Sequence, residues 1–163
     1  MNYIQIDRTN CVEIILHKFP AFRTQWDLHL ESWNSLIERP IALDIAEFAD
    51  FAIDTIATGI DPEIEKVVEV TEQMLADGDS VIQYAFRRLF LEQIAHRRSR
   101  GGFPVDRFTS KLHPLGYYHW HAIDLDWNIN LVPALQTTGN LAWQQLCEHL
   151  KLWRYLPLLI DSG

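Results

Sequence analysis

Helix start and stop signals recur at short intervals through the first hundred residues, and each interval holds an apolar pattern of helical period. Proline, aspartate and asparagine stand where helices would begin, and glycine or proline stands where they would end. The pattern predicts five helices: one over CVEIILHKF, one from Pro20 to Pro40, one from about Leu43 to Thr58, one from Asp61 to Gly78 and one from Asp79 to Gly101. Their short connections favour antiparallel neighbours. We therefore expect an all-α chain, an antiparallel helical array built as a bundle or as a short stack of helix pairs.

The fifth predicted helix differs from the others because apolar residues cover most of its circumference. These residues are Val81, Ile82, Ala85, Phe86, Leu89, Phe90, Leu91 and Ile94. A helix that is apolar nearly all round is surrounded by other elements. We expect this helix at the centre of the array, with the amphipathic helices before it packed around it.

After the fifth helix the signals weaken in a segment that is rich in aromatic residues and interrupted by prolines. We expect one short helix within residues 105–112, and an irregular segment near 103–139 that folds back over the helices because exposed rings are costly. The partial alternation in HWHAIDLDWNINL leaves a short strand or hairpin open. A last helix is expected from Asn140 to about Tyr155. No linker separates these parts, so residues 1–163 are expected to form a single domain.

Composition excludes several functional classes. The formal net charge is -8 and the sequence pI is about 5.2, so nucleic acid and anionic membranes would repel the chain at long range. No run of eighteen apolar residues and no signal-peptide pattern is present. The two cysteines, Cys11 and Cys147, form no closely spaced pair, which favours a reducing compartment over a disulfide framework. We expect a cytoplasmic protein.

The charges divide along the chain. Residues 27–79 hold fourteen acidic and two basic residues, whereas residues 87–111 hold seven basic and two acidic ones. Acids follow one side of each of two helices: Asp44, Glu47, Asp50 and Asp54 on the third, and Glu65, Glu69 and Glu72 on the fourth. If these helices are neighbours, the acids could merge into one acidic surface. Such a surface is either a solvated face or a docking surface for a basic partner.

The basic run HRRSRGG ends the fifth predicted helix. Arginine near a helix C-terminus is favoured by the helix dipole, and salt bridges to the acidic helices of the same chain are also expected. These two structural explanations suffice, and no phosphate or nucleic-acid site is assigned to the run.

A group of histidines is the one candidate metal site. His113, His119 and His121 lie within nine residues and are followed by Asp124 and Asp126. On an extended segment the rings of His119 and His121 would lie on one side, where Asp124 could complete a metal site. The spacing matches no zinc or iron signature, so packing or surface histidines are the favoured interpretation. A metal-dependent enzyme is the alternative.

No other catalytic motif is present. The chain has no GxSxG elbow and no phosphate-binding glycine loop. His149 and Cys147 are two residues apart on a predicted helix and would not face each other. His29 stands between Trp26 and Trp33 and is interpreted as a satisfied core or boundary histidine. We assign no catalytic residue, expect no cofactor and do not expect an enzyme.

Three stretches together resemble a known family. They are KFPAFRTQWDLHLESW, DIAEFADFAIDTIATG and GDSVIQYAFRRLFLEQI, in that order, within residues 18–95. Their shared features are an FPxF start before a tryptophan-bearing helix, an acidic helix with paired phenylalanines (Phe48 and Phe51), and a Gly-Asp turn into a helix that ends in leucine-glutamate. The chain resembles a family of small, acidic, all-helical bacterial proteins of uncharacterised biochemistry that look like toxin-neutralising immunity proteins.

This resemblance implies a protein that binds a cognate bacterial toxin and blocks its active site, with carboxylates taking the place of substrate phosphates in a basic cleft. Direct contact with nucleic acid or membrane is not expected. A helical protein–protein adaptor is a second alternative. The residues expected to bind the partner are the acids of the two acidic helices together with exposed aromatics of the later segment: Asp44, Glu47, Asp50, Asp54, Glu65, Glu69, Glu72, Tyr117, Tyr118 and Trp120.

Overall fold

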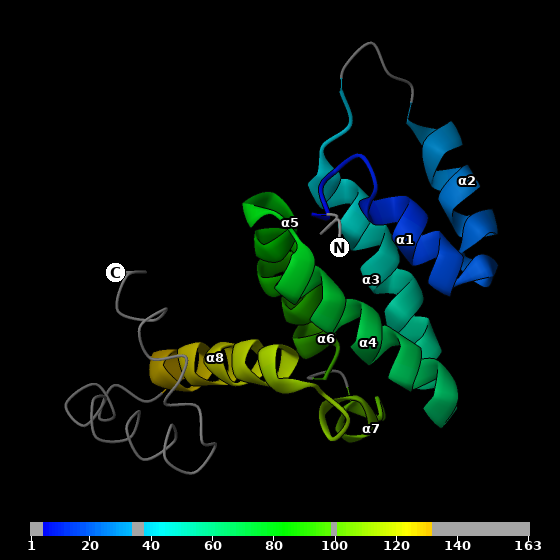
Figure 1. Cartoon of the computed structure of the whole chain (residues 1–163). Coiled ribbons are helices and arrows are strands. Elements are labelled where there is room, and N and C mark those ends of the chain that lie inside the picture. Colours follow the sequence, from blue (N-terminus) through cyan, green and yellow to red (C-terminus); the bar gives the residue numbers. More distant parts are fainter. Residues whose placement is uncertain (1–4, 34–37, 99–100, 132–163) are drawn as a thin grey trace. The chain divides into compact units, whose positions relative to one another are not determined.

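The computed structural model describes residues 5–33, 38–98 and 101–131, with only the backbone given for 126–131. The elements in chain order are α1 (Cys11–Lys18), η1 (Pro20–Phe22), α2 (Arg23–Ser32), α3 (Ile41–Ala57), α4 (Asp61–Asp77), α5 (Ser80–Ala85), η2 (Phe86–Phe90), α6 (Leu91–Arg98), α7 (Val105–Thr109) and α8 (Pro114–Leu131) (Figure 1). The expected all-α class is confirmed. Within the described ranges, the only extended pairing is a parallel bridge between Ile6 and Gly78.

The chain divides into two compact units, residues 1–120 and 121–163. The second unit is described only as far as residue 131, as the second half of α8. The expected single domain stays a prediction. The expected last helix from Asn140 to about Tyr155, and Cys147 within it, lie outside the described residues.

Local chemistry explains where the helices start and stop. The Asp79 carboxylate accepts hydrogen bonds from the backbone amides of Val81 (3.0 Å) and Ile82 (2.9 Å), so it caps α5 as expected. Gly59 follows α3 with a φ of 69°, a conformation that favours glycine at a helix end. At Gly78, which ends α4, a Cβ atom would lie 2.3 Å from the carbonyl oxygen of Met74. Only glycine fits there.

The fifth predicted helix is present as α5, η2 and α6, which follow one another without a break. It is central as expected: it packs against both α3 and α4, and Phe86, Phe90 and Leu91 are fully buried. η2 is a π-helical stretch in its middle, a wider turn that no local sequence signal indicated. Val81 is 50% exposed, so the expected apolar circumference does not hold at the first turn.

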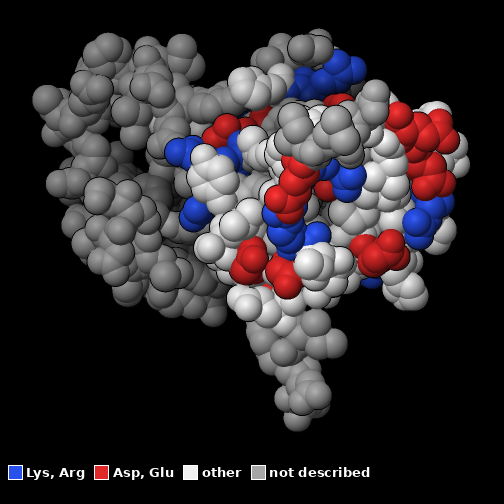
Figure 2. Space-filling model, turned by 90° about the horizontal axis from the view of Figure 1, so that it is seen from above, with Lys and Arg blue, Asp and Glu red and all other residues white. Residues whose placement is uncertain are grey.

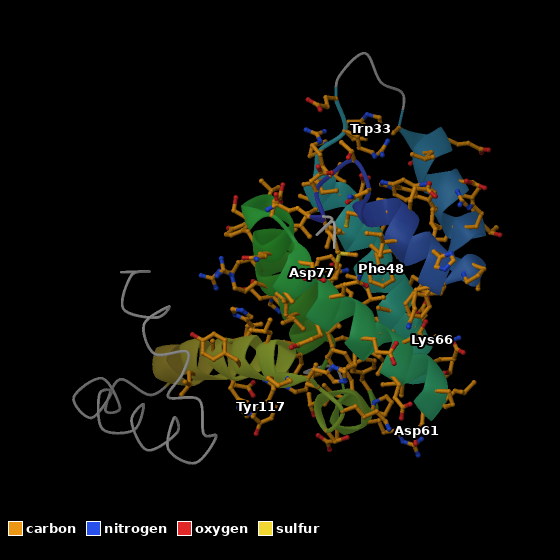
Figure 3. The ribbon with its side chains drawn as sticks, viewed as in Figure 1. Trp33, Phe48, Asp61, Lys66, Asp77 and Tyr117 are labelled. Atoms are coloured by element: carbon orange, nitrogen blue, oxygen red, sulfur yellow. The ribbon has the colours of Figure 1, made fainter. Side chains whose placement is uncertain are left out.

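An aromatic cluster joins η1 and α2 to the central helices. Phe22 lies 5.5 Å from Phe48 and 5.1 Å from Phe51, measured between ring centroids, and Phe48 stacks on Phe90 at 5.4 Å. Phe48 lies between the helices in Figure 3. Burying each such ring stabilises the fold by about 1.5–3 kcal/mol relative to exposure. Trp26 extends the cluster along α2, where it is also buried.

The sequence also predicts an apolar stripe along the second helix, made of Phe22, Trp26, Leu30, Trp33, Leu36 and Ile37, and this stripe is only partly present. Phe22 and Trp26 are buried, but Leu30 is 38% exposed and α2 ends at Ser32. Trp33 is half-buried just after α2, and Leu36 and Ile37 lie outside the described residues.

The irregular segment expected near residues 103–139 is wrong for residues 114–131, which are helical, and the short strand that the sequence left open is not present there. The short helix expected within 105–112 is present as α7, but residues 114–131 form the helix α8. α8 starts with Pro114 in its first turn, where a proline is favoured. Its first amides bond to the Glu72 carboxylate, which is more than forty residues earlier in the chain. A tertiary cap of this kind leaves no local sequence signal.

Candidate functional site

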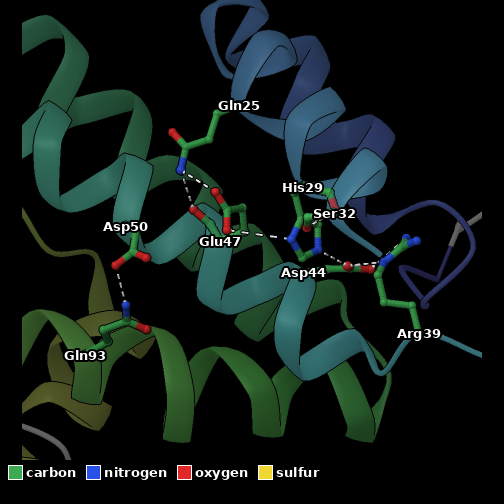
Figure 4. A network of polar contacts seen from close by, with 8 residues as sticks. All are labelled: Gln25, His29, Ser32, Arg39, Asp44, Glu47, Asp50 and Gln93. Carbon is green, nitrogen blue, oxygen red and sulfur yellow. Dashed lines mark hydrogen bonds and ion pairs between the residues drawn. The ribbon is translucent and has the colours of Figure 1, made fainter. Parts of the chain in front are cut away.

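Asp44 was expected on an acidic surface, and this expectation is wrong. Its side chain is only 6% exposed because α2 covers the first turn of α3. Asp44 Oδ1 lies 2.9 Å from His29 Nε2 and accepts from Arg39 Nε at 2.5 Å, while Oδ2 accepts from Arg39 Nη2 at 3.2 Å (Figure 4). The two-point contact with a guanidinium stabilises a carboxylate that would otherwise be costly to bury.

His29 lies between two carboxylates of α3. Its Nε2 contacts Asp44, and its Nδ1 is 3.6 Å from Oε2 of Glu47. Glu47 is held from the other side by Gln25, whose Nε2 donates to Glu47 Oε1 at 2.7 Å and to its backbone carbonyl at 3.3 Å. The spacing of Gln25 and His29 puts both on the face of α2 that meets α3. We call Gln25, His29, Arg39, Asp44 and Glu47 the α2–α3 network.

The α2–α3 network is closed by an aromatic side chain. The Trp26 ring lies 5.3 Å from the His29 ring, and the Arg39 guanidinium lies over the Trp26 ring at 5.1 Å. The Ser32 hydroxyl donates to the backbone oxygen of His29 at 2.7 Å, so it makes no hydrogen bond to the imidazole. Both ring nitrogens of His29 already face protein carboxylates, which leaves neither to act on a substrate. His29 is a satisfied boundary histidine, as expected, and the network clamps α2 to α3.

The other acids of α3 lie nearer to solvent. Asp50 accepts from Gln93 Nε2 at 2.6 Å, and partial burial raises the pKa of Asp50, with Glu47 and Asp54 adding to the effect. Asp54 is exposed and makes no hydrogen bond or ion pair through its side chain with any described residue. The expected acidic row on α3 is therefore split between a buried end at Asp44 and an exposed end at Asp54.

The three acids expected along α4 all have partners in the same chain. Glu65 Oε1 is 3.0 Å from Lys111 Nζ, and Glu69 pairs with Lys18. Glu72 accepts from the backbone amides of Leu115 (3.1 Å) and Gly116 (2.9 Å) and so caps α8. Glu72 is thus a structural residue and is corrected from a surface acid to a helix cap.

The α3 and α4 acids do not merge into one acidic surface. On the face drawn in Figure 2, basic and acidic side chains lie next to one another rather than apart. Lys111 of the basic segment pairs with Glu65 and lies 3.9 Å from Asp61, so the acidic and basic segments of the sequence meet at the start of α4.

Two of the three aromatics expected to be exposed are buried, so this expectation is wrong. Tyr118 is 5% and Trp120 is 3% exposed. The Trp120 ring packs edge-on against Phe108 at 5.9 Å, and the Arg98 guanidinium lies over it at 5.7 Å. Helical geometry turns these side chains inward, whereas an irregular segment could have left them in solvent. Tyr117, labelled in Figure 3, is half-buried.

The histidines of α8 do not have the arrangement that a metal site would need. His119 and His121 are two residues apart on a helix, so their rings point to different sides, and the extended conformation that a shared metal site would need is not present. Burial lowers the pKa of His119 to about 4, and nearby Arg87 contributes to the shift. Burial also lowers the pKa of His121, against an opposing effect of Asp124. The part of the chain that the structure describes contains no group of three or more ligands that could hold a metal.

Cys11 is the one cysteine among the described residues, and it is buried. Its Sγ lies 3.7 Å from Met74 Sδ, and burial raises the pKa of the thiol to about 12, with Asp44, Asp79 and Asp7 contributing. A thiol that stays protonated is a poor nucleophile. Cys11 is a core residue.

Sequence reasoning missed the roles of Gln25 and Arg39. A signal was present for Gln25, since Gln25 and His29 are four residues apart and share a helix face. Asp44 and Glu47, three residues apart on α3, share a face in the same way. The sequence does not show that these two faces meet, because this contact depends on how α2 packs on α3.

The sequence matches the family described as Domain of unknown function (DUF7674) over residues 12–125, more than two thirds of the chain. The chain belongs to this family. No curated protein and no solved structure matches it. Among the described residues, none of the helices is both long enough and apolar enough to cross a membrane.

Proposed function

We propose that this protein is an immunity protein, which binds a basic bacterial toxin and neutralises it by covering the toxin's active site. It acts in the cytoplasm as a binding protein rather than an enzyme and uses no cofactor. Its partner is the cognate toxin, and it contacts neither nucleic acid nor membrane directly.

The observation that carries this proposal is negative charge that the chain leaves uncompensated. The formal net charge is -8, and the carboxylates of the exposed acids Asp27, Glu31, Asp54 and Asp106 make no hydrogen bond or ion pair with any described residue. Uncompensated charge repels within the folded state and raises association rates with a partner of opposite sign. A toxin that acts on nucleic acids or nucleotides would offer such a partner, because its cleft must attract phosphates.

The α2–α3 network supports a binding role over catalysis. It is the largest partly buried polar cluster described above, and its histidine has both ring nitrogens directed at protein carboxylates. The separated rings of His119 and His121 likewise give the metal-enzyme alternative little support.

The proposal is tested by tagging the protein in its native host and identifying stoichiometric partners by mass spectrometry. The expected partner is a basic protein whose affinity falls steeply with salt concentration, because charge attraction drives the association. A partner that is harmless when expressed alone would contradict immunity and favour the adaptor alternative. Binding that does not respond to salt would contradict an acidic interface.

A further inference from the structure

We propose that the outer face of α2, centred on Leu28 and flanked by Asp27 and Glu31, is the surface that docks a basic protein partner. This inference deepens the proposed function by naming the interface, and it rests on that function for the class of partner.

The spacing of residues on α2 separates an inner from an outer face. Trp26 and the two network residues Gln25 and His29 face the rest of the unit. Thr24, Asp27, Leu28 and Glu31, at helical spacings of three and four, are all exposed on the other side. Figure 1 shows α2 as an edge helix of the first unit.

Leu28 is the apolar centre of this face. It is 62% exposed, and no large hydrophobic side chain among the described residues is more exposed. The fold gains nothing from a leucine left in water there, whereas burying it in a complex would remove apolar surface from water and favour association. An apolar centre with a charged rim is the usual layout of a protein–protein interface.

The rim of this face carries negative charges that are not compensated by any described residue. The carboxylates of Asp27 and Glu31 make no hydrogen bond or ion pair with any described residue. By contrast, the exposed acids of α4 are compensated, Glu65 by Lys111 and Glu69 by Lys18. Uncompensated acids beside an exposed leucine make the outer face of α2 complementary to an apolar pocket rimmed by lysine or arginine.

The α2–α3 network gives this face a fixed position. Arg39 and His29 converge on Asp44, and Gln25 holds Glu47, so α2 is fastened to α3 by polar contacts along its inner face. A face that is already rigid loses less conformational entropy on binding. The α2–α3 network therefore preorganises the outer face of α2 for binding.

The charge of the face also decides between classes of occupant. A second copy of the chain would bring acids against acids, and nucleic acid or an anionic membrane would be repelled. A basic protein is the occupant that the charge fits.

The first test uses a defined probe, a short amphipathic helical peptide made of leucine and lysine, titrated into the full-length protein labelled with ¹⁵N. Backbone shift changes are expected to concentrate on residues 23–32. Leu28→Ser should raise the Kd about tenfold or more. Val81→Ser is the matched control, because Val81 is 50% exposed on α5 and lies outside the proposed face. Equal effects of the two substitutions would overturn the proposal.

The second test compares two double charge reversals. Asp27→Lys with Glu31→Lys should weaken peptide binding more than Glu65→Lys with Glu69→Lys, although both change the net charge equally. All four side chains are exposed, and the thermal midpoint of each variant checks that it is folded. A larger effect of the Glu65 and Glu69 pair would place the interface on α4 and overturn the proposal.

These outcomes are distinguishable from failure of the proposed function. If the peptide binds at α2 but no toxic partner exists, the docking face stands and immunity falls. If a toxin is found and a photo-crosslinker at position 28 never reaches it, immunity stands and the docking face falls.

Discussion

His119 and Cys11 show at the residue scale how burial sets the chemistry of a titratable side chain. Both belong to residue types that often act in catalysis, and in both burial favours the neutral form. The pKa of His119 is lowered to about 4 and that of Cys11 is raised to about 12. At neutral pH the His119 imidazole is uncharged and the Cys11 thiol is protonated, so Cys11 does not supply the thiolate that nucleophilic catalysis requires.

The lowered pKa of His119 predicts a loss of stability in acid. The unfolded chain binds a proton at this residue below a pH of about 6.5, while the folded chain stays neutral until about pH 4. The free energy of unfolding should therefore fall by about 3 kcal/mol as the pH drops through this window, and the contribution levels off below it.

Urea titrations at several pH values of the native chain and of His119→Asn measure this effect. The variant should show a shallower fall between about pH 6.5 and 4. His113→Asn, which removes an exposed histidine just before α8, is the matched control. Identical pH profiles for the native chain and His119→Asn would contradict the assignment.

Residue identity alone did not tell surface acids from structural ones. Glu65, Glu69 and Glu72 form one row in the sequence, yet the first two make surface ion pairs and the third caps a helix. The difference depends on which segment lies opposite each carboxylate, and helical periodicity contains no information about that. The same is true of Asp44, whose burial depends on α2.

Glu72 leads to a prediction at the scale of elements, because it caps a helix distant in sequence. Glu72→Ala should lower the free energy of unfolding by about 1–2 kcal/mol, since two amides at the start of α8 lose a charged acceptor. Hydrogen exchange at the first turn of α8 should become faster. Glu69→Ala, a matched change at an exposed ion pair, should cost no more than about 1 kcal/mol. An equal cost for both would rule out a capping role.

The attachment of α2 gives a second prediction at this scale. Asp44→Ala leaves His29 and Arg39 without their shared acceptor and should destabilise the fold by about 2–4 kcal/mol. Amide exchange should accelerate in α2 before it does so in α4. Asp27→Ala removes an exposed acid of α2 that lies outside the α2–α3 network, and it should change the free energy of unfolding by no more than about 0.5 kcal/mol. If Asp44→Ala left exchange in α2 unchanged, the network would not be its anchor.

The helices before α8 were largely readable from the sequence, because aspartate, proline and glycine mark several of their ends. Asp79 caps α5 through its side chain, and Gly59 ends α3 in a left-handed conformation. α8 was missed because its cap comes from Glu72 and because apolar and polar residues alternate in a way that also suits a strand. The π-helical stretch of η2 was missed since it depends on packing around Phe86 and Phe90.

Charge compensation is the feature that matters at the scale of the whole molecule. The sequence separates acids from bases, but in the folded chain Lys111 of the basic segment pairs with Glu65 of α4, and Lys18 of α1 pairs with Glu69. The candidate interface shifts accordingly, from the acidic rows of α3 and α4 to the outer face of α2. The candidate interface could be located only from the ion pairs of the folded chain, which the sequence does not show.

The proposed immunity function is tested by measuring whether this protein neutralises its toxic partner in living cells. The basic partner recovered from the native host is expressed inducibly in a heterologous bacterium, alone and together with this protein. We expect growth to stop with the partner alone and to resume when the native chain is also expressed. Leu28→Ser should restore growth less well than Val81→Ser. Growth arrest that persists when the native chain is present at a matching level would contradict the immunity function.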